Sequence, residues 1–387
     1  MYVTSLEFEN YRNLTRDVIY PQRDINVICG ENAQGKTNLI ECLWLFTGGR
    51  SFRGSKDNDL VRFGEKTARI KLCFYSSGRE QTIELEIGGG KRRPVLNDVP
   101  KNSVSQIIGS FCAVVFSPDH LTLIKSGPEG RRNFIDAAIC QIKPSYAVIL
   151  SRYRRILSER NALLKEIPRR RELEDTLDIW DDRLSREGAI IAYERFSYVQ
   201  ELSVQAGKFY EGISRGREIL SMKYRTNCGA ESGMDKKEIA SLTFEALRKR
   251  QNDDILCGYT TVGVHRDDLN VRIDGRETRL FGSQGQQRSA VLSLKLAEAY
   301  LLGEKKGEAP VILLDDVLSE LDLSRQEYLL NRLDGMQVFI TCCEPALNAV
   351  NVISVKNGTI SAGLPSGSAE AGASQPAAED TRDLARE

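Results

Sequence analysis

The feature that most constrains this chain is a glycine-rich turn near its start. Residues 30–37 read Gly30-Glu31-Asn32-Ala33-Gln34-Gly35-Lys36-Thr37, which matches the spacing G-x-x-x-x-G-K-[ST]. An apolar run, Ile25–Cys29, precedes this P-loop, and an amphipathic helix is expected from about Lys36 to Phe46. In such a strand–turn–helix unit the backbone N–H groups of the loop point at phosphate oxygens. We therefore expect all eight residues to bind ATP, with Lys36 facing the β- and γ-phosphates and Thr37 ligating Mg²⁺.

A second motif far along the chain supplies two carboxylates. Val311–Leu314 is expected to form a buried strand, and Asp315 and Asp316 follow it directly. Asp315 is expected to help Thr37 hold Mg²⁺, and Asp316 to orient or deprotonate the attacking water. The catalytic residues we predict are therefore Lys36, Asp315 and Asp316. The alternative is a strand that merely ends in a polar turn.

A third motif precedes the two carboxylates. Ser283-Gln284-Gly285-Gln286 stands before a helix expected from about Ser289 to Leu302. Serine and glycine at a helix start can bind an anion. Because the P-loop already serves the chain's own nucleotide, this turn suggests contact with the ATP of another subunit. The alternative is a glycine turn that only caps a helix.

Residue patterns divide the chain into an α/β part and a helical part. Alternating strand-like runs dominate the first third, a helical pattern extends from about Glu129 to Arg250, and strand patterns return after Asp254. Pro168 and the three arginines after it read as a turn between two long helices. The fold class expected is α/β with an inserted helical region. Residues 361–387 are small and polar, and we expect a disordered tail there.

Composition excludes little. Lys plus Arg and Asp plus Glu both number 54, so any basic surface must be local. The start lacks a signal-peptide pattern and no apolar run reaches about 18 residues, so we expect a soluble cytoplasmic protein.

The middle of the chain is locally basic, which suggests DNA-phosphate binding or only a solvated helix face. The basic residues are Arg131, Arg132, Arg152, Arg154, Arg155, Arg160, Lys165, Arg169, Arg170 and Arg171, and all but Arg154, Arg160 and Lys165 are taken as candidate DNA contacts.

Together these motifs resemble the ABC-type ATPases of DNA repair, and among them the RecF family. Ser283–Gln286 resembles the ABC signature, and Ser319-Glu320-Leu321-Asp322 resembles the D-loop. Three more stretches resemble the RecF family, and the whole resemblance covers about residues 1–345. They are Asn10-Tyr11-Arg12-Asn13-Leu14, Gly49-Arg50-Ser51-Phe52-Arg53 and Val264-His265-Arg266-Asp267-Asp268-Leu269.

The resemblance implies a two-lobed ATPase head. Lobe I would combine residues 1–115 and 255–360, with a mixed β-sheet and helices, and lobe II would be helical, over residues 116–254. Two ATP molecules would be sandwiched in a homodimer, each P-loop facing the partner's signature in trans. Arg12 would join the nucleotide site, and Ser319 and Asp322 would act in the D-loop.

The resemblance also implies a function. The dimer would bind gapped DNA at single-strand/double-strand junctions, hydrolyse ATP weakly in a DNA-dependent way as a timer, and involve no membrane. With RecO and RecR it would promote RecA loading, and so support recombinational repair, replication restart and the SOS response.

Some positions depart from the resemblance. Cys342 follows Thr341 where ABC proteins usually carry the switch histidine, and Asp316 stands where they usually carry glutamate. The stretch Phe116–Asp119 holds no Q-loop glutamine, and Val264 stands where the family often has proline. His265 fits either a structural role or a nucleotide or interface contact. Two other classes stay open: the ATPase subunit of a transporter and a P-loop small-molecule kinase.

Overall fold

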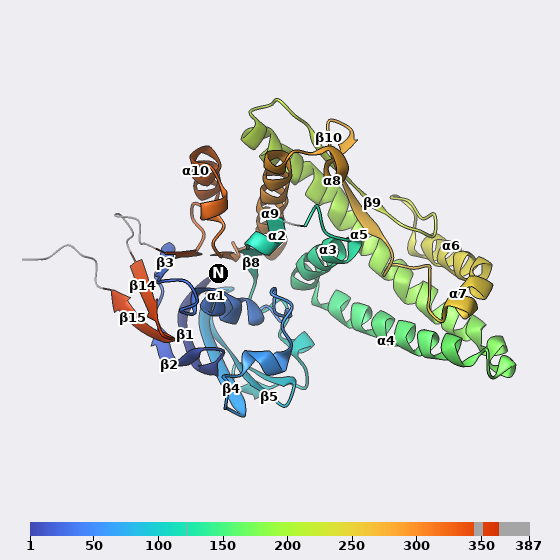
Figure 1. Cartoon of the computed structure of the whole chain (residues 1–387), viewed down its shortest axis with the longest axis horizontal. Coiled ribbons are helices and arrows are strands. Elements are labelled where there is room, and N and C mark those ends of the chain that lie inside the picture. Colours follow the sequence, from blue (N-terminus) through green and yellow to red (C-terminus); the bar gives the residue numbers. More distant parts are fainter. Residues whose placement is uncertain (122, 344–350, 364–387) are drawn as a thin grey trace, which may run out of the picture.

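The computed structural model describes residues 1–121, 123–343 and 351–363, and Figure 1 shows two lobes. One lobe contains the N-terminus and most of the strands, and the other is built mainly from long helices (Figure 1). No helix among these residues is long and apolar enough to span a membrane. The expected tail lies outside the described residues from 364 onward, and residues 361–363 belong to a strand.

A six-stranded sheet forms the centre of the first lobe. Its order is β15-β14-β3-β13-β12-β8, and all neighbours are parallel except β14 and β15. The strands are β3 (Ile25–Cys29), β8 (Ala113–Phe116), β12 (Val311–Leu314), β13 (Val338–Cys342), β14 (Asn351–Lys356) and β15 (Thr359–Gly363). β8 and β12 are buried throughout, which explains their unbroken apolar sequences.

A second, antiparallel sheet completes this lobe, in the order β2-β1-β4-β5-β6-β7. Its strands are β1 (Tyr2–Tyr11), β2 (Leu14–Ile19), β4 (Thr67–Ser76), β5 (Arg79–Gly88), β6 (Lys91–Leu96) and β7 (Val99–Pro100). Ala68, Ile70, Leu72 and Phe74 of β4 are buried in alternation, as expected of a half-buried strand. Helix α1 (Lys36–Leu45) shares one apolar core with both sheets.

The second lobe packs helices around a small sheet. The helices are α3 (Pro128–Ile142), α4 (Pro144–Glu166), α5 (Leu177–Ser214), α6 (Lys236–Lys249) and α7 (Gln251–Cys257), and the sheet β11-β10-β9 contains β9 (Leu220–Arg225), β10 (Asp268–Ile273) and β11 (Arg276–Glu277). β9 interrupts the region expected to be mostly helical. The core of this lobe includes Leu269, Val271 and Ile273 of β10, beyond the expected boundary at residue 254.

Helix α9 (Gln284–Lys306) connects the two lobes. Val291 and Leu294 join the core of the helical lobe, whereas Leu292 and Leu296 join a core beneath the parallel sheet. Three short helices flank this region, namely α2 (Pro118–Leu121), α8 (Thr278–Phe281) and α10 (Leu323–Arg332). Short 3₁₀ helices occupy Asp57–Leu60, Val104–Gln106, Arg171–Thr176 and Leu318–Glu320. Because α9 begins at the signature turn, that turn is carried by a helix that packs into the cores of both lobes.

Candidate nucleotide-binding site

The P-loop connects β3 to α1. At two of its positions the backbone conformation and the neighbouring atoms allow only glycine. Gly30 has φ 156° and Gly35 has φ 120°. A Cβ on Gly30 would lie 2.3 Å from the Val355 carbonyl oxygen, and one on Gly35 would lie 2.8 Å from Asn13 Oδ1. Asn13 Nδ2 in turn donates to the Gln34 carbonyl at 3.0 Å. The required glycines therefore reflect close packing as well as backbone angle.

The lysine of the P-loop curls back over the loop. Lys36 Nζ donates to the Gly30 carbonyl at 2.5 Å and to the Glu31 carbonyl at 3.1 Å. Glu31, Asn32 and Ala33 are exposed, so the crest of the loop is open to solvent. A cation beside an open loop at a helix N-terminus is suited to binding phosphate.

The fold brings the second motif to the P-loop. Thr37 Oγ1 donates to Asp315 Oδ1 at 2.9 Å, and Thr341 Oγ1 donates to the same oxygen at 3.1 Å. These contacts exist because β12 pairs in parallel with β13, so that both strands end at one edge of the sheet. Asp315 is 5% exposed, and burial raises the pKa of its carboxyl group although the two hydroxyls oppose that rise.

These donors fit a magnesium ion. Mg²⁺ takes hard oxygen ligands and keeps several waters, so one hydroxyl and one carboxylate suffice on the protein side. Thr37 and Asp315 provide that pair, joined directly to each other at 2.9 Å. The donor set therefore agrees with the predicted metal ligands.

Asp316 differs from its neighbour in exposure and backbone. It is exposed, and its φ of 52° turns the chain sharply after β12. Its backbone N–H donates to Thr341 Oγ1 at 2.8 Å, and Ser319 Oγ donates to Asp316 Oδ1 at 3.0 Å. Asp322, the other predicted D-loop residue, caps α10 by accepting from the Arg325 N–H at 3.1 Å. Asp316 is thus accessible to a water, and Ser319 helps to hold it.

The predicted nucleotide contact Arg12 is anchored by an acid that the motifs did not reveal. Arg12 Nε and Nη2 donate to the two oxygens of Glu41 at 2.7 and 2.9 Å, and Nη2 also donates to Ser55 Oγ at 2.7 Å. Glu41 lies on α1 and is fully buried. A nucleotide role for Arg12 stays a prediction, because most of its donors are engaged within the protein.

Arg53 is a further residue of the site that the motifs did not single out. Its charge opposes the rise that burial causes in the pKa of Asp315. Arg53 is exposed, and its Nη1 donates to Asn38 Oδ1 at 2.9 Å. Only its place in the stretch 49–53 could have pointed to it.

Two cysteines follow Thr341, and they lie in different surroundings. Cys342 Sγ lies 3.1 Å from Cys29 Sγ, between the two strands. Cys343 is exposed instead, with Sγ 3.8 Å from Lys36 Nζ and 3.4 Å from Asn32 Oδ1. The side chain that faces the P-loop after Thr341 is therefore that of Cys343.

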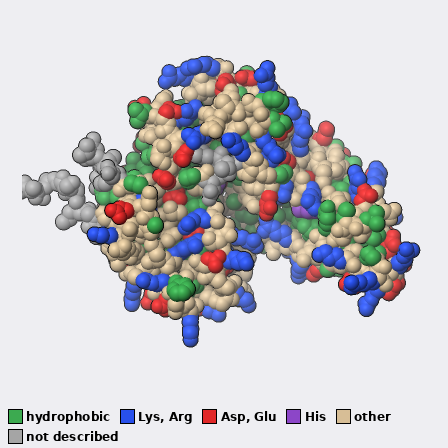
Figure 2. Space-filling view, viewed as in Figure 1, with side chains coloured by type: hydrophobic (Ala, Val, Ile, Leu, Met, Phe, Trp, Pro, Cys, Tyr) green, Lys and Arg blue, Asp and Glu red, His purple; other side chains and the backbone are tan. Residues whose placement is uncertain are grey.

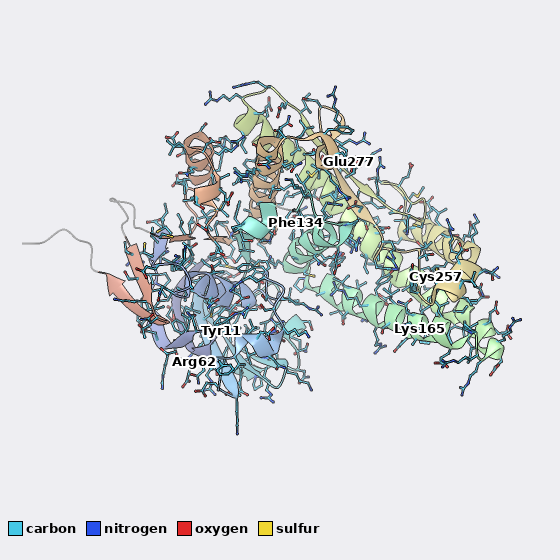
Figure 3. All side chains as sticks on the ribbon, in the orientation of Figure 1. Tyr11, Arg62, Phe134, Lys165, Cys257 and Glu277 are labelled. Atoms are coloured by element: carbon cyan, nitrogen blue, oxygen red, sulfur yellow. The ribbon has the colours of Figure 1, made fainter. Side chains whose placement is uncertain are left out.

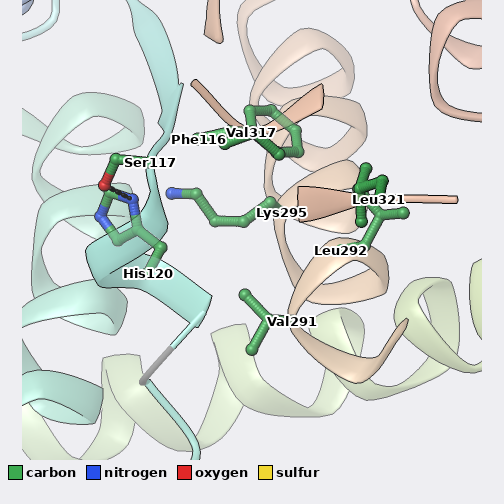
Figure 4. Close-up of a pocket in the computed structure, with 8 residues that line it drawn as sticks. All are labelled: Phe116, Ser117, His120, Val291, Leu292, Lys295, Val317 and Leu321. Carbon is green, nitrogen blue, oxygen red and sulfur yellow. Dashed lines mark hydrogen bonds between the residues drawn. The ribbon is translucent and has the colours of Figure 1, made fainter. Parts of the chain in front are cut away.

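The stretch after β8, where the sequence offers no Q-loop glutamine, lines a small pocket. Figure 4 shows Ser117 and His120 opposite Lys295 of α9, among apolar residues. Ser117 Oγ and His120 Nδ1 are 2.9 Å apart. Burial, and then the charge of Lys295, lowers the pKa of His120 well below its usual range. Lys295 Nζ pairs with buried Glu298 at 2.5 Å, so this pocket holds its own ion pair.

The signature turn, Ser283–Gln286, is a closed cap on α9. Ser283 Oγ accepts from the Gln286 N–H at 3.2 Å, and the Ser283 N–H donates to Gln286 Oε1 at 2.8 Å. Ser283 and Gln284 are exposed. Leu280 and Phe281, just before the turn, are 67% and 70% exposed. The turn thus presents a helix N-terminus and apolar side chains to solvent.

The candidate DNA contacts fall into different environments, and Arg131 requires a correction. It is 3% exposed, pairs with Asp268 at 2.7 Å and donates to backbone carbonyls of residues 123, 124 and 126. A guanidinium used up inside the protein cannot bind DNA, so Arg131 is structural.

The other candidates are more accessible. Arg132 is partly exposed, whereas Arg152 and Arg155 are exposed and lie 3.6 and 3.8 Å from Glu187 and Glu159. Arg169, Arg170 and Arg171 are exposed between α4 and α5. Figure 2 shows Lys and Arg side chains gathered at that end of the helical lobe.

Comparisons with known proteins agree with this geometry. The family described as "RecF/RecN/SMC N terminal domain" matches residues 2–359. The DNA replication and repair protein RecF of Acetivibrio thermocellus is 38% identical over 348 residues, covering 90% of this chain and 94% of the relative. That of Agathobacter rectalis is 41% identical over 345 residues, covering 88% and 92%.

Solved structures give the same result. "The recombination mediator protein RecF-ATPrS in RecFOR pathway" superposes with a TM-score of 0.89 at 36% identity, covering 93% of this chain and 98% of the other. An Smc head domain from Pyrococcus furiosus, at 17% identity and a TM-score of 0.52 over 93% of this chain and 95% of its own, shares the fold. Neither the transporter ATPase nor the small-molecule kinase gains support. With its P-loop, paired aspartates and signature turn carried on an ABC-type ATPase head, the chain belongs to the RecF family of DNA replication and repair proteins.

Proposed function

We propose that this protein is an ATP-driven, DNA-binding ATPase of recombinational repair. The observation that carries the proposal is the 2.9 Å hydrogen bond between Thr37 and Asp315. It joins the P-loop to the second motif across 278 positions of sequence. Local spacing alone could not make this contact, and it has the arrangement that a nucleotide–magnesium complex requires.

The residues of the site have separable tasks in hydrolysis. The P-loop N–H groups and Lys36 bind the phosphates, and Thr37 with Asp315 would hold Mg²⁺, which neutralises charge on the β- and γ-phosphates. Exposed Asp316, restrained by Ser319, orients the attacking water and accepts its proton. Because no histidine follows Thr341, Cys343, which contacts Lys36, and Arg53, whose charge acts on Asp315, are the candidates for sensing the γ-phosphate.

The nucleotide also controls assembly in this proposal. Figure 1 places α8 and the start of α9 away from β3 and α1, so the signature turn does not cover its own P-loop. Two copies arranged head to head would let each exposed Ser283 cap the partner's γ-phosphate. The exposed Leu280 and Phe281 would be covered in such a dimer.

DNA is the proposed macromolecular partner. Gapped DNA with single-strand/double-strand junctions is the proposed form, and RecO and RecR are the proposed protein partners in loading RecA and in SOS induction. A slow, DNA-dependent hydrolysis would act as a timer that releases the dimer. The expected location is the cytoplasm.

The test is binding of fluorescent gapped DNA, measured by anisotropy with ATP, with ADP and without nucleotide. We expect binding to be tightest with ATP, and Lys36→Ala to remove that nucleotide dependence. Equal DNA affinity in all three conditions, or no DNA binding at all, would overturn the proposal.

A further inference from the structure

The loop from Tyr259 to Asp268, the 259–268 loop, is held in place by side chains from elsewhere. Asn161 Oδ1 accepts from the backbone N–H of Thr260 at 2.8 Å and from its hydroxyl at 2.7 Å. Asp254 Oδ1 does the same for Thr261, at 2.9 and 2.7 Å. Two separate side chains therefore fix consecutive residues at the start of the loop.

Two buried arginines donate hydrogen bonds to the loop. Arg160 is fully buried and donates to Thr260 Oγ1 at 2.9 Å. Arg195 is 2% exposed and donates to the Val264 carbonyl at 2.7 Å while it pairs with Asp136. Buried polar networks of this kind fix one geometry, and they are a means of preorganising a surface that binds.

Two guanidinium groups, one in the loop and one that donates to it, have no acid partner. Arg266 is exposed and lies over the ring of Tyr259 at 5.1 Å. Arg132, on α3, donates to the backbone carbonyl of Asp267 at 2.7 Å. Among the described residues neither forms an ion pair, unlike Arg131, which Asp268 neutralises. Burial, and then the nearby Arg195, lowers the pKa of Arg132, and the charges of Asp267 and Asp268 only partly oppose this.

A neutral histidine lies near both cations. His265 Nδ1 is 2.7 Å from the Tyr153 hydroxyl, and Nε2 is 3.1 Å from the Thr260 carbonyl. Burial is the main cause that lowers the pKa of His265 to about 4; the hydrogen bond to Thr260 opposes it, and the charges of Arg266 and Arg132 contribute to it. The ring therefore adds no charge at neutral pH, and the excess positive charge belongs to the two arginines.

We propose that Arg132, Arg266 and Tyr259 form a phosphate-binding site for the DNA backbone. This inference rests on the proposed function and names the surface that performs it. Unpaired guanidiniums match phosphate oxygens in charge and in their forked geometry, and an exposed tyrosine adds a surface on which a base can stack.

A third cation borders the site. Lys165 is exposed, and its Cγ lies 3.3 Å from where a Cβ on Gly258 would be. Figure 3 shows Lys165 of α4 and Cys257 of α7 on the same part of the helical lobe. The site thus continues toward the arginines at residues 169–171, which a longer DNA segment would reach.

The test includes a double variant and a control that lose equal charge. Arg266→Gln and Arg132→Gln/Arg266→Gln remove the proposed contacts. Arg186→Gln/Arg248→Gln is the control, because both control residues are exposed and each already lies near an acid. Affinity for gapped, single-stranded and double-stranded DNA is measured by anisotropy with ATP at several salt concentrations.

We expect each lost contact to weaken binding about tenfold. The slope of log affinity against log salt should fall by about 0.9 per contact if the phosphates are double-stranded, and by about 0.7 if they are single-stranded. The control variant should keep the wild-type slope. ATP hydrolysis and ATP-driven dimer mass, both measured without DNA, should not change in any of these variants.

Arg266 is exposed, so Arg266→Gln decides the matter even if the double variant fails to fold. Wild-type DNA affinity in Arg266→Gln, an equal loss in the control, or a loss of the ATP-driven dimer would each overturn this site. If the wild type itself does not bind DNA, the proposed function fails as well, which separates the two failures.

Discussion

Replacing Arg160 should destabilise the helical lobe strongly. Arg160, Asp181 and Asp254 are all fully buried. The guanidinium donates to Asp181 at 2.6 Å and to Asp254 at 2.7 Å. Arg160→Met leaves two carboxylates in a dry interior, and removing one partner of a buried pair costs about 3–5 kcal/mol. Burial already raises the pKa of Asp181 despite its arginine partner, so the lone carboxylate will be still harder to ionise.

The assay can isolate this lobe because the chain has two tryptophans, Trp44 in the first lobe and Trp180 on α5. In a Trp44→Phe background, urea unfolding followed by Trp180 fluorescence reports the helical lobe. We expect Arg160→Met to lose about 3–5 kcal/mol of unfolding free energy. Adding Asp181→Asn should restore part of it, because one uncompensated charge disappears. A loss below about 1 kcal/mol, or no recovery in the double variant, would refute this reasoning.

Three other substitutions test the site and the loop. Lys36→Ala should weaken ATP binding about 10- to 100-fold, measured by calorimetry, because a charged phosphate contact is lost; unchanged affinity would show that this loop does not bind the phosphates. Asp316→Asn should bind ATP normally but slow steady-state turnover about 100-fold or more, since an amide cannot act as a base; normal turnover would mean that another group positions the water. The pKa of His265 is lowered to about 4, so between pH 6.5 and pH 4 the unfolded state takes up a proton that the folded state resists, and stability falls as pH falls. His265 thereby lowers the free energy of unfolding by about 2 kcal/mol between pH 8 and pH 5. Asp267 offsets part of this loss, because its pKa is raised to about 6 and its protonation stabilises the folded state in acid. His265→Gln should therefore lose less stability than the wild type from pH 8 to pH 5 in urea unfolding, while His120, whose pKa burial also lowers, still contributes a loss; a fall as steep as the wild type's would contradict the assignment.

The sequence was sufficient where the chemistry is local. Spacing defined the P-loop and the helix after it, because both depend on neighbouring residues. The contact of Thr37 with Asp315 depends on the order of strands in the sheet. The two motifs together predicted that Asp315 would work with Thr37, whereas the strand order that brings them together could not be read from local pattern.

The sequence did not reveal which charged side chains are buried. Arg131 and Arg132 are adjacent, yet only Arg131 faces the interior, where Asp268 neutralises it. Glu41 looked like an ordinary polar residue of a helix, but it is the buried partner of Arg12. The side chains that hold the 259–268 loop by hydrogen bonds include Asn161 and Asp254, which lie outside it in the sequence. Local sequence pattern therefore does not reveal them.

The central claim is that ATP joins two copies through the signature turn, and the mass of the protein in solution tests it most directly. Light scattering should give a dimer with ATP and a monomer with ADP or without nucleotide. Ser283→Arg should stay monomeric with ATP while it still binds the nucleotide, because a bulky side chain on the exposed cap of α9 would collide with the partner's γ-phosphate. A dimer of Ser283→Arg with ATP, or an ADP dimer of the wild type equal to its ATP dimer, would contradict the account.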